Sequence, residues 1–142
     1  MNGARFPLTR PLPTEPSARR LALSAAPGTV AEARAFTADF LADVTDPVVV
    51  GDAVLLVSEL VGNVVRHTGG PGALLLVRVA GLLRIEVSDS SPRPPLPRLP
   101  HGPPSEPGGL GLFLLGRLAL QWGWRPLGPG KAVWCDLRLP VS

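Results

Sequence analysis

A short stretch, SELVGNVVRHT (58–68), places ionisable and amide side chains among valines and leucines. Glu59 and Asn63 are four residues apart, so in a helix they lie on the same face, one turn apart. A carboxylate can act as a general base, and a carboxamide oxygen is a hard ligand for a magnesium ion that bridges phosphates. The pair indicates phosphate chemistry if it faces a ligand, although a solvent-facing stripe has the same periodicity.

The helix that must carry these residues is predicted from DPVVVGDAVLLVSELVGNVVRHT, with Asp46 as its N-cap and Pro47 at its first position. At about 100° per residue, its polar stripe falls within an arc of about 100°. That arc contains Asp52, Leu56, Glu59, Asn63, Arg66 and His67. The opposite side is apolar and holds Ala53, Val54, Val57, Leu60, Val61, Val64 and Val65. Asparagine is a mediocre helix former, so its place in mid-helix favours a role beyond solubility.

The remaining segments predict a sheet and two more helices. RRLALSA (19–25) alternates like a strand, and the helix that follows begins with a capping box formed by Thr29 and Glu32. ALLLVRVA and LLRIEVSD form a hairpin at Gly81, GLGLFLLGRLALQWGW begins as a helix, and WGWRPL and KAVWCDLRLP are strands around GPG. This order predicts an α+β fold, a two-layer sandwich with a mixed, mainly antiparallel sheet and three helices on one face.

Proline marks two segments outside this core. Residues 1–17 hold four prolines and predict a disordered N-terminal arm, which leaves 18–142 as the domain. Residues 90–109 hold eight prolines, a density that excludes a helix or a central strand. A long loop inside a compact domain is typically disordered or a functional lid, and we expect a lid at 90–107.

Composition limits the classes of partner and compartment. The formal charge is +3, only Lys131 among the 14 basic residues is a lysine, and no dense basic run predicts a nucleic-acid surface. The single cysteine, Cys135, lies in an alternating strand pattern and is expected to be a packed thiol. We expect neither a signal peptide nor a membrane span of roughly 18 uncharged apolar residues, and therefore a soluble, cytoplasmic protein.

Four segments, ELVGNVVRH, VSDSSPRPP, GGLGLFLL and GKAVW, resemble in order and spacing the successive boxes of GHKL-type ATP-binding domains. Gyrase, sensor histidine kinases and anti-sigma factor serine kinases share these domains. The resemblance covers about residues 19 to 140. The compact form is most similar to the anti-sigma factor serine/threonine kinase branch, particularly its single-domain relatives in actinomycetes.

The resemblance implies ATP and Mg²⁺ as cofactors. Glu59 would activate the attacking hydroxyl, and Asn63 would bind the magnesium that bridges the phosphates. Arg66 and His67 would line the phosphate side or brace the lid. Asp89 would accept a hydrogen bond from the adenine amino group.

The later boxes imply further cofactor contacts. Gly109, Leu110 and Gly111 match the second glycine box, where backbone amides at a helix start cradle phosphate. Ala132 stands where the family often has a threonine that assists adenine recognition through the aspartate. Losing that hydrogen bond would weaken binding by about 1.5 to 3 kcal/mol. Ser91 replaces a glycine that many relatives have two residues after the aspartate.

Three functions are compatible with these residues. The resemblance implies a protein kinase that phosphorylates an anti-sigma antagonist and sequesters a sigma factor. Relatives often form a homodimer, which would involve residues near Leu21 to Phe40. The alternative is a protein-binding module with a weak or degenerate nucleotide site, which Ala132 and the proline-rich lid favour. A metal-independent hydrolase using Glu59, His67 and Asp89 lacks a nucleophile beside the histidine.

We expect Trp122, Trp124 and Trp134 to pack mostly between sheet and helices.

Overall fold

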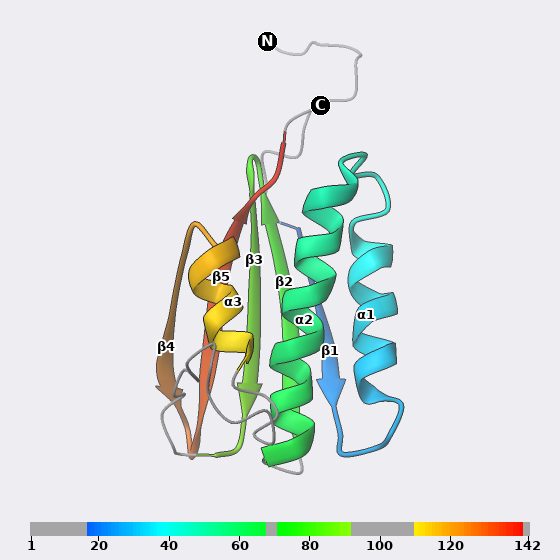
Figure 1. Cartoon of the computed structure of the whole chain (residues 1–142). Coiled ribbons are helices and arrows are strands. Elements are labelled where there is room, and N and C mark those ends of the chain that lie inside the picture. The colour runs from blue at the N-terminus through cyan, green and yellow to red at the C-terminus, as the bar shows by residue number, and fades with distance from the viewer. Residues whose placement is uncertain (1–16, 68–70, 92–109, 141–142) are drawn as a thin grey trace, which may run out of the picture.

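The computed structural model describes residues 17–67, 71–91 and 110–140 as one sheet with helices against it (Figure 1). The elements, in chain order, are β1 (Ser17–Leu23), α1 (Thr29–Phe40), α2 (Pro47–His67), β2 (Gly72–Val79), β3 (Leu82–Asp89), α3 (Leu110–Leu118), β4 (Gln121–Leu127) and β5 (Gly130–Arg138). The strand order is β1-β2-β3-β5-β4, and all three helices cover one face. The predicted two-layer α+β architecture is confirmed.

The sheet departs from the prediction in one respect: in the part of the chain that the structure describes, every pair of neighbouring strands is antiparallel, whereas a mixed sheet was expected. The hairpin at Gly81 is confirmed, and that glycine has a φ of 83° in the turn. Residues 1–16 of the expected arm and 92–107 of the expected lid lie outside the described residues, as does Gly109 of the second glycine box. Ser17, the last residue of the expected arm, is already part of β1.

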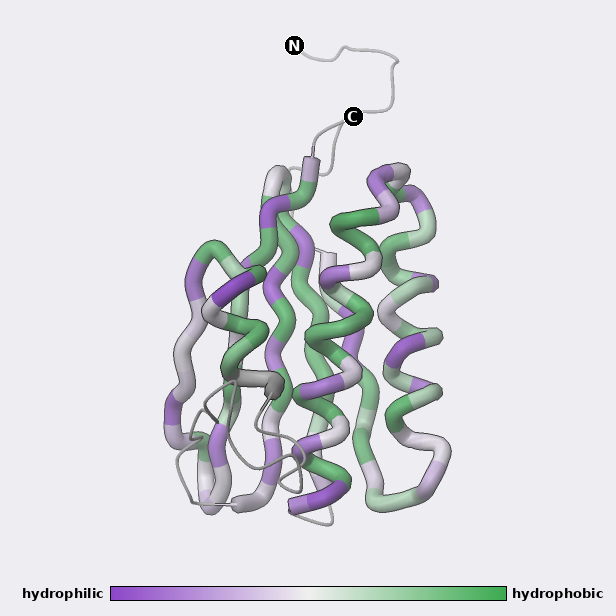
Figure 2. Tube along the Cα trace, viewed as in Figure 1, coloured by the Kyte–Doolittle hydropathy of each residue, from purple (hydrophilic) through white to green (hydrophobic). Residues whose placement is uncertain are grey.

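Helix α2 lies at the centre of the helical layer and contacts α1, α3, β3 and β5. Its buried residues are Ala53, Leu56, Val57, Leu60, Val61, Gly62 and Val64. The prediction placed Leu56 in the polar arc, but its side chain is 0% exposed. A helical wheel assumes one buried face, whereas α2 has neighbours on both flanks as well as the sheet beneath it. Figure 2 shows the hydrophobic residues running along α2 and the polar ones interrupting its C-terminal half.

Helix α2 is also, within the described ranges, the one helix long and apolar enough to cross a membrane. This test tolerates charged residues, and α2 contains Asp52, Glu59 and Arg66, whereas the sequence prediction concerned an uncharged apolar run. A core helix passes the same test, and α2 belongs to the hydrophobic core of the sandwich.

The two predicted helix starts have different outcomes. Asp46 is confirmed as a cap, because its Oδ1 accepts a hydrogen bond of 2.9 Å from the Val48 backbone N–H. The predicted capping box of α1 is wrong: Gly28 is the N-cap, and no side chain caps this helix. Thr29 is already helical, and its hydroxyl lies 3.2 Å from Oγ of Ser24 instead.

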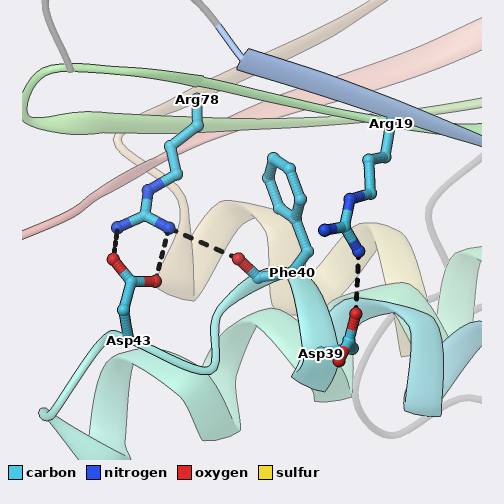
Figure 3. Close-up of polar contacts among 5 residues, drawn as sticks. All are labelled: Arg19, Asp39, Phe40, Asp43 and Arg78. Atoms are coloured by element: carbon cyan, nitrogen blue, oxygen red, sulfur yellow. Dashed lines mark hydrogen bonds and ion pairs between the residues drawn. The ribbon is translucent and has the colours of Figure 1, made fainter.

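Two arginines of the sheet fasten the C-terminal end of α1 (Figure 3). Arg78 of β2 forms a bidentate ion pair with Asp43, at 2.8 and 2.9 Å, and donates to the backbone carbonyl of Phe40 at 3.3 Å. Arg19 of β1 pairs with Asp39 at 2.7 Å and lies over the Phe40 ring. A cation at a helix C-terminus satisfies carbonyls that have no partner within the helix, so these contacts set how α1 lies on the sheet.

The sheet face without helices carries a polar network. Asp136 accepts a bidentate ion pair from Arg84, at 2.7 and 2.9 Å, and a bond of 2.7 Å from Gln121. The guanidinium of Arg84 also lies 4.3 Å from the Trp134 ring. The hydrogen bond from Arg84 holds the pKa of Asp136 below its usual range. Such a carboxylate stays ionised although its side chain is only 4% exposed.

The three tryptophans lie in different environments, and Cys135 lies in the core. Trp122 packs against the core as expected, whereas Trp124 is 39% exposed. Trp134 was expected between the layers but lies with Arg84 on the helix-free face, because its strand neighbours face the helices. Cys135 is a buried thiol as predicted, and burial raises its pKa to about 12.

Candidate functional site

The elements that carry the residues predicted to act on a nucleotide meet at one end of the sandwich. The C-terminal end of α2, the end of β3 and the start of β5 lie together there, and α3 directs its N-terminus toward the same end (Figure 1). Leu110 and Gly111 form the first turn of α3, while Gly109 lies outside the described residues. A helix N-terminus offers unpaired N–H groups to an anion, so this arrangement suits phosphate.

Glu59 and Asn63 lie on successive turns of α2 at the border between its buried and exposed sides. Both are half-buried, which distinguishes them from a fully solvated stripe. Glu59 has no ion pair or hydrogen-bond partner among the side chains of the described ranges. A half-buried carboxylate near a phosphate site is a reasonable position for a general base.

Asn63 already has a partner in the neighbouring turn. Its Oδ1 accepts a hydrogen bond of 3.1 Å from Arg66. The same guanidinium covers Gly62, where an added Cβ would lie 3.1 Å from an Arg66 nitrogen. His67 is the last residue of α2 and is exposed. The structure thus brings Arg66 to the asparagine, where it occupies one of the two lone pairs of the amide oxygen.

Two oxygen-bearing side chains on α2 are candidates to bind magnesium. Magnesium keeps several waters and is usually held by one or two protein groups together with substrate phosphates. Asn63 supplies an amide oxygen and Glu59 a carboxylate one turn away. No group of three or more His, Cys, Asp or Glu side chains suited to a metal occurs in the part of the chain that is described. The residues fit a metal bound mainly through the nucleotide, and not a metal held by the protein alone.

At the end of β3, Asp89 faces Lys131 of β5 in direct register. The Lys131 ammonium lies 3.1 Å from Oδ1 and 2.9 Å from Oδ2, and Oδ1 also accepts the Ser91 backbone N–H at 2.9 Å. The two side chains are only 9% and 10% exposed. Asp89 is on the helix-facing side, since it follows Ile85 and Val87 at alternate positions of the strand. The carboxylate predicted to bind adenine is therefore largely shielded from solvent and paired with a lysine.

Ala132 is not brought to Asp89. It pairs with Ser88, one position along the strand, and successive side chains of a strand point to opposite faces. Its methyl group therefore points to the helix-free face, and the side chain opposite the carboxylate is that of Lys131. Sequence reasoning noted Lys131 only as the single lysine, because cross-strand register is not visible in one segment.

Gly130 makes this register possible. A Cβ at this position would lie 1.8 Å from the carbonyl oxygen of Asp89, a distance no real contact allows. The strand can begin beside Asp89 only because residue 130 has no side chain. The glycine of the GKAVW segment thus has a packing role that its sequence context did not specify.

Comparisons with known proteins give a family match and a similar fold. The sequence model of the histidine kinase-like ATPase domain matches residues 23–134. Curated protein sequences give no significant match. Among solved structures, the fold is similar to the crystal structure of the RsbU and RsbW domains of Rv1364c from Mycobacterium tuberculosis, with a TM-score of 0.66 and 20% identity. The similarity covers 87% of this chain and 32% of that one, so this chain spans about a third of its length.

Proposed function

The chain belongs to the histidine kinase-like ATPase domain family, and from that premise we propose that it is an ATP-binding regulator of the anti-sigma type that phosphorylates a protein partner. The observation that carries the proposal is the pair of Glu59 and Asn63, half-buried one turn apart on α2. A domain that only holds a partner needs no general base. The four sequence boxes and the similarity to a chain with an RsbW domain support the anti-sigma branch.

The proposed reaction transfers the γ-phosphoryl group of ATP to a serine or threonine hydroxyl of the partner. The hydroxyl oxygen bonds to phosphorus, the bond to the β-phosphate oxygen breaks, and ADP leaves. Glu59 accepts the hydroxyl proton, and Asn63 would hold the magnesium through its amide oxygen. Bound magnesium would neutralise charge on the phosphate oxygens. By its resemblance, the partner would be an anti-sigma antagonist, and a sigma factor would be sequestered by the same protein.

A second function is favoured by a different observation. Asp89 is paired with Lys131 and Asn63 with Arg66, so two groups that a nucleotide would need already have partners within the chain. Such a site suits a protein-binding module that binds nucleotide weakly. The Asp89–Lys131 and Asn63–Arg66 pairs would then keep the site in one conformation when no ligand is bound.

Calorimetric titration with ATP and magnesium separates the two functions. The kinase proposal expects binding below millimolar nucleotide, a loss of roughly tenfold or more in Asn63→Ala, and transfer of labelled phosphate to a partner. Glu59→Gln should bind ATP like the wild type but transfer no phosphate, because only the proton acceptor is lost. Undetectable binding at millimolar nucleotide would leave only the binding module. Binding without transfer to any antagonist-type partner would refute the kinase step alone.

A further inference from the structure

The ion pair between Lys131 and Asp89 needs an explanation beyond folding. Burying two opposite charges costs desolvation energy that their attraction only partly offsets, and an apolar pair is often as stable. Here the pair lies on the helix-facing side, at the end of the sandwich where α2 and α3 meet the strands. A role in ligand binding would explain why two charged side chains occupy this place.

The hydrogen bonds of Asp89 and Lys131 leave donor and acceptor positions that a ligand could use. Oδ1 of Asp89 accepts bonds from Lys131 and from the Ser91 N–H, which uses both of its lone pairs. Among the residues that the structure describes, Oδ2 accepts from Lys131 alone, so one acceptor position remains. An ammonium has three N–H donors, of which at most two point to the carboxylate. One acceptor and one donor therefore remain side by side, since these two atoms are 2.9 Å apart.

Adenine presents the complementary pattern on its Watson–Crick edge, where the 6-amino group donates and the adjacent ring nitrogen N1 accepts. We propose that Lys131 is a second nucleobase-recognition residue, which donates a hydrogen bond to N1 while Asp89 accepts one from the 6-amino group. The inference rests on the proposed function, because it requires that ATP is the ligand. It makes the net-neutral pair, and not the carboxylate alone, the determinant of adenine specificity.

The experiment compares ATP with two analogues by calorimetric titration of the full chain with magnesium. In 1-deaza-ATP a C–H group replaces N1, and in 7-deaza-ATP a C–H group replaces N7 on the other edge of the ring. The wild type should bind 1-deaza-ATP roughly tenfold more weakly than ATP, and 7-deaza-ATP about as well as ATP. Lys131→Met should bind ATP roughly tenfold more weakly and should no longer distinguish ATP from 1-deaza-ATP.

Arg125→Met is the matched control, because it also removes a basic partner of a carboxylate, Glu86, but on the helix-free face. It should keep the wild-type preference for ATP over 1-deaza-ATP. The wild-type comparison needs no variant, so it stays decisive even if Lys131→Met folds poorly.

Two results would overturn the inference and leave ATP binding intact. One is equal binding of ATP and 1-deaza-ATP by the wild type. The other is ATP binding by Lys131→Met that is as tight as, or tighter than, wild-type binding, which would mean that the lysine only closes Asp89. Absence of any ATP binding by the wild type would instead refute the proposed function, and the inference with it.

Discussion

The buried carboxylate on the helix-free face offers a sharp test of the structure. Arg84→Met removes the bidentate partner of Asp136 and the cation over Trp134, while Gln121 still donates to the carboxylate. Breaking a fully buried ion pair costs about 3 to 5 kcal/mol. The Arg84 side chain is 43% exposed, so solvent screening lowers that figure. We expect the free energy of unfolding of Arg84→Met at pH 7 to be about 2 kcal/mol lower than that of the wild type. This corresponds to a Tm lower by roughly 8 °C.

The pH dependence identifies the ionised carboxylate as the cause. The pKa of Asp136 in the folded protein lies below its usual value of about 3.9 because of the Arg84 hydrogen bond. The stabilisation is therefore fully present above the unfolded-state pKa and is lost as the pH falls through the folded-state pKa. The Tm difference between wild type and Arg84→Met should be constant above about pH 5 and shrink below about pH 4.

Thermal unfolding followed by circular dichroism from pH 7 to pH 3 measures this difference. Arg138→Met is the control, because Arg138 lies on the same strand and face but has no ion pair within the described ranges. It should change the Tm little at any pH. A difference for Arg84→Met that stays constant down to pH 3 would refute the reasoning, because it would show that packing and not charge provides the stabilisation.

Three further predictions concern packing. Gly130→Ala should destabilise the fold by about 3 kcal/mol in denaturant unfolding, because its Cβ would overlap a backbone carbonyl. The control Gly116→Ala, whose Cβ would meet no atom within 4 Å, should be neutral or stabilising. Equal effects of the two substitutions would contradict the β3–β5 register. Cys135, with a pKa of about 12, should react with a thiol reagent only after unfolding, and rapid native labelling would refute its burial. A double-mutant cycle of Arg78→Met and Asp43→Asn should give a coupling of about 0.5 to 1 kcal/mol, and a coupling near zero would show that the pair does not hold α1.

The predictable part of this protein is local in sequence. The period of α2, the cap at Asp46 and the hairpin at Gly81 were predicted, because periodicity and turn chemistry act over a few residues. The same pattern placed Glu59 and Asn63 on one face of a helix. The order of the four boxes predicted the family and the sandwich fold.

What only the tertiary structure decided depends on residues far apart in the chain. The burial of Leu56 follows from helices on both flanks of α2, which a helical wheel cannot include. The pairing of Asp89 with Lys131, and the direction of Ala132 to the other face, follow from the β3–β5 register. A strand's sequence shows which residues share a face, but long-range pairing determines what lies opposite each of them. Residue types therefore predicted the chemistry of the site, and strand register decided which side chain faces the carboxylate.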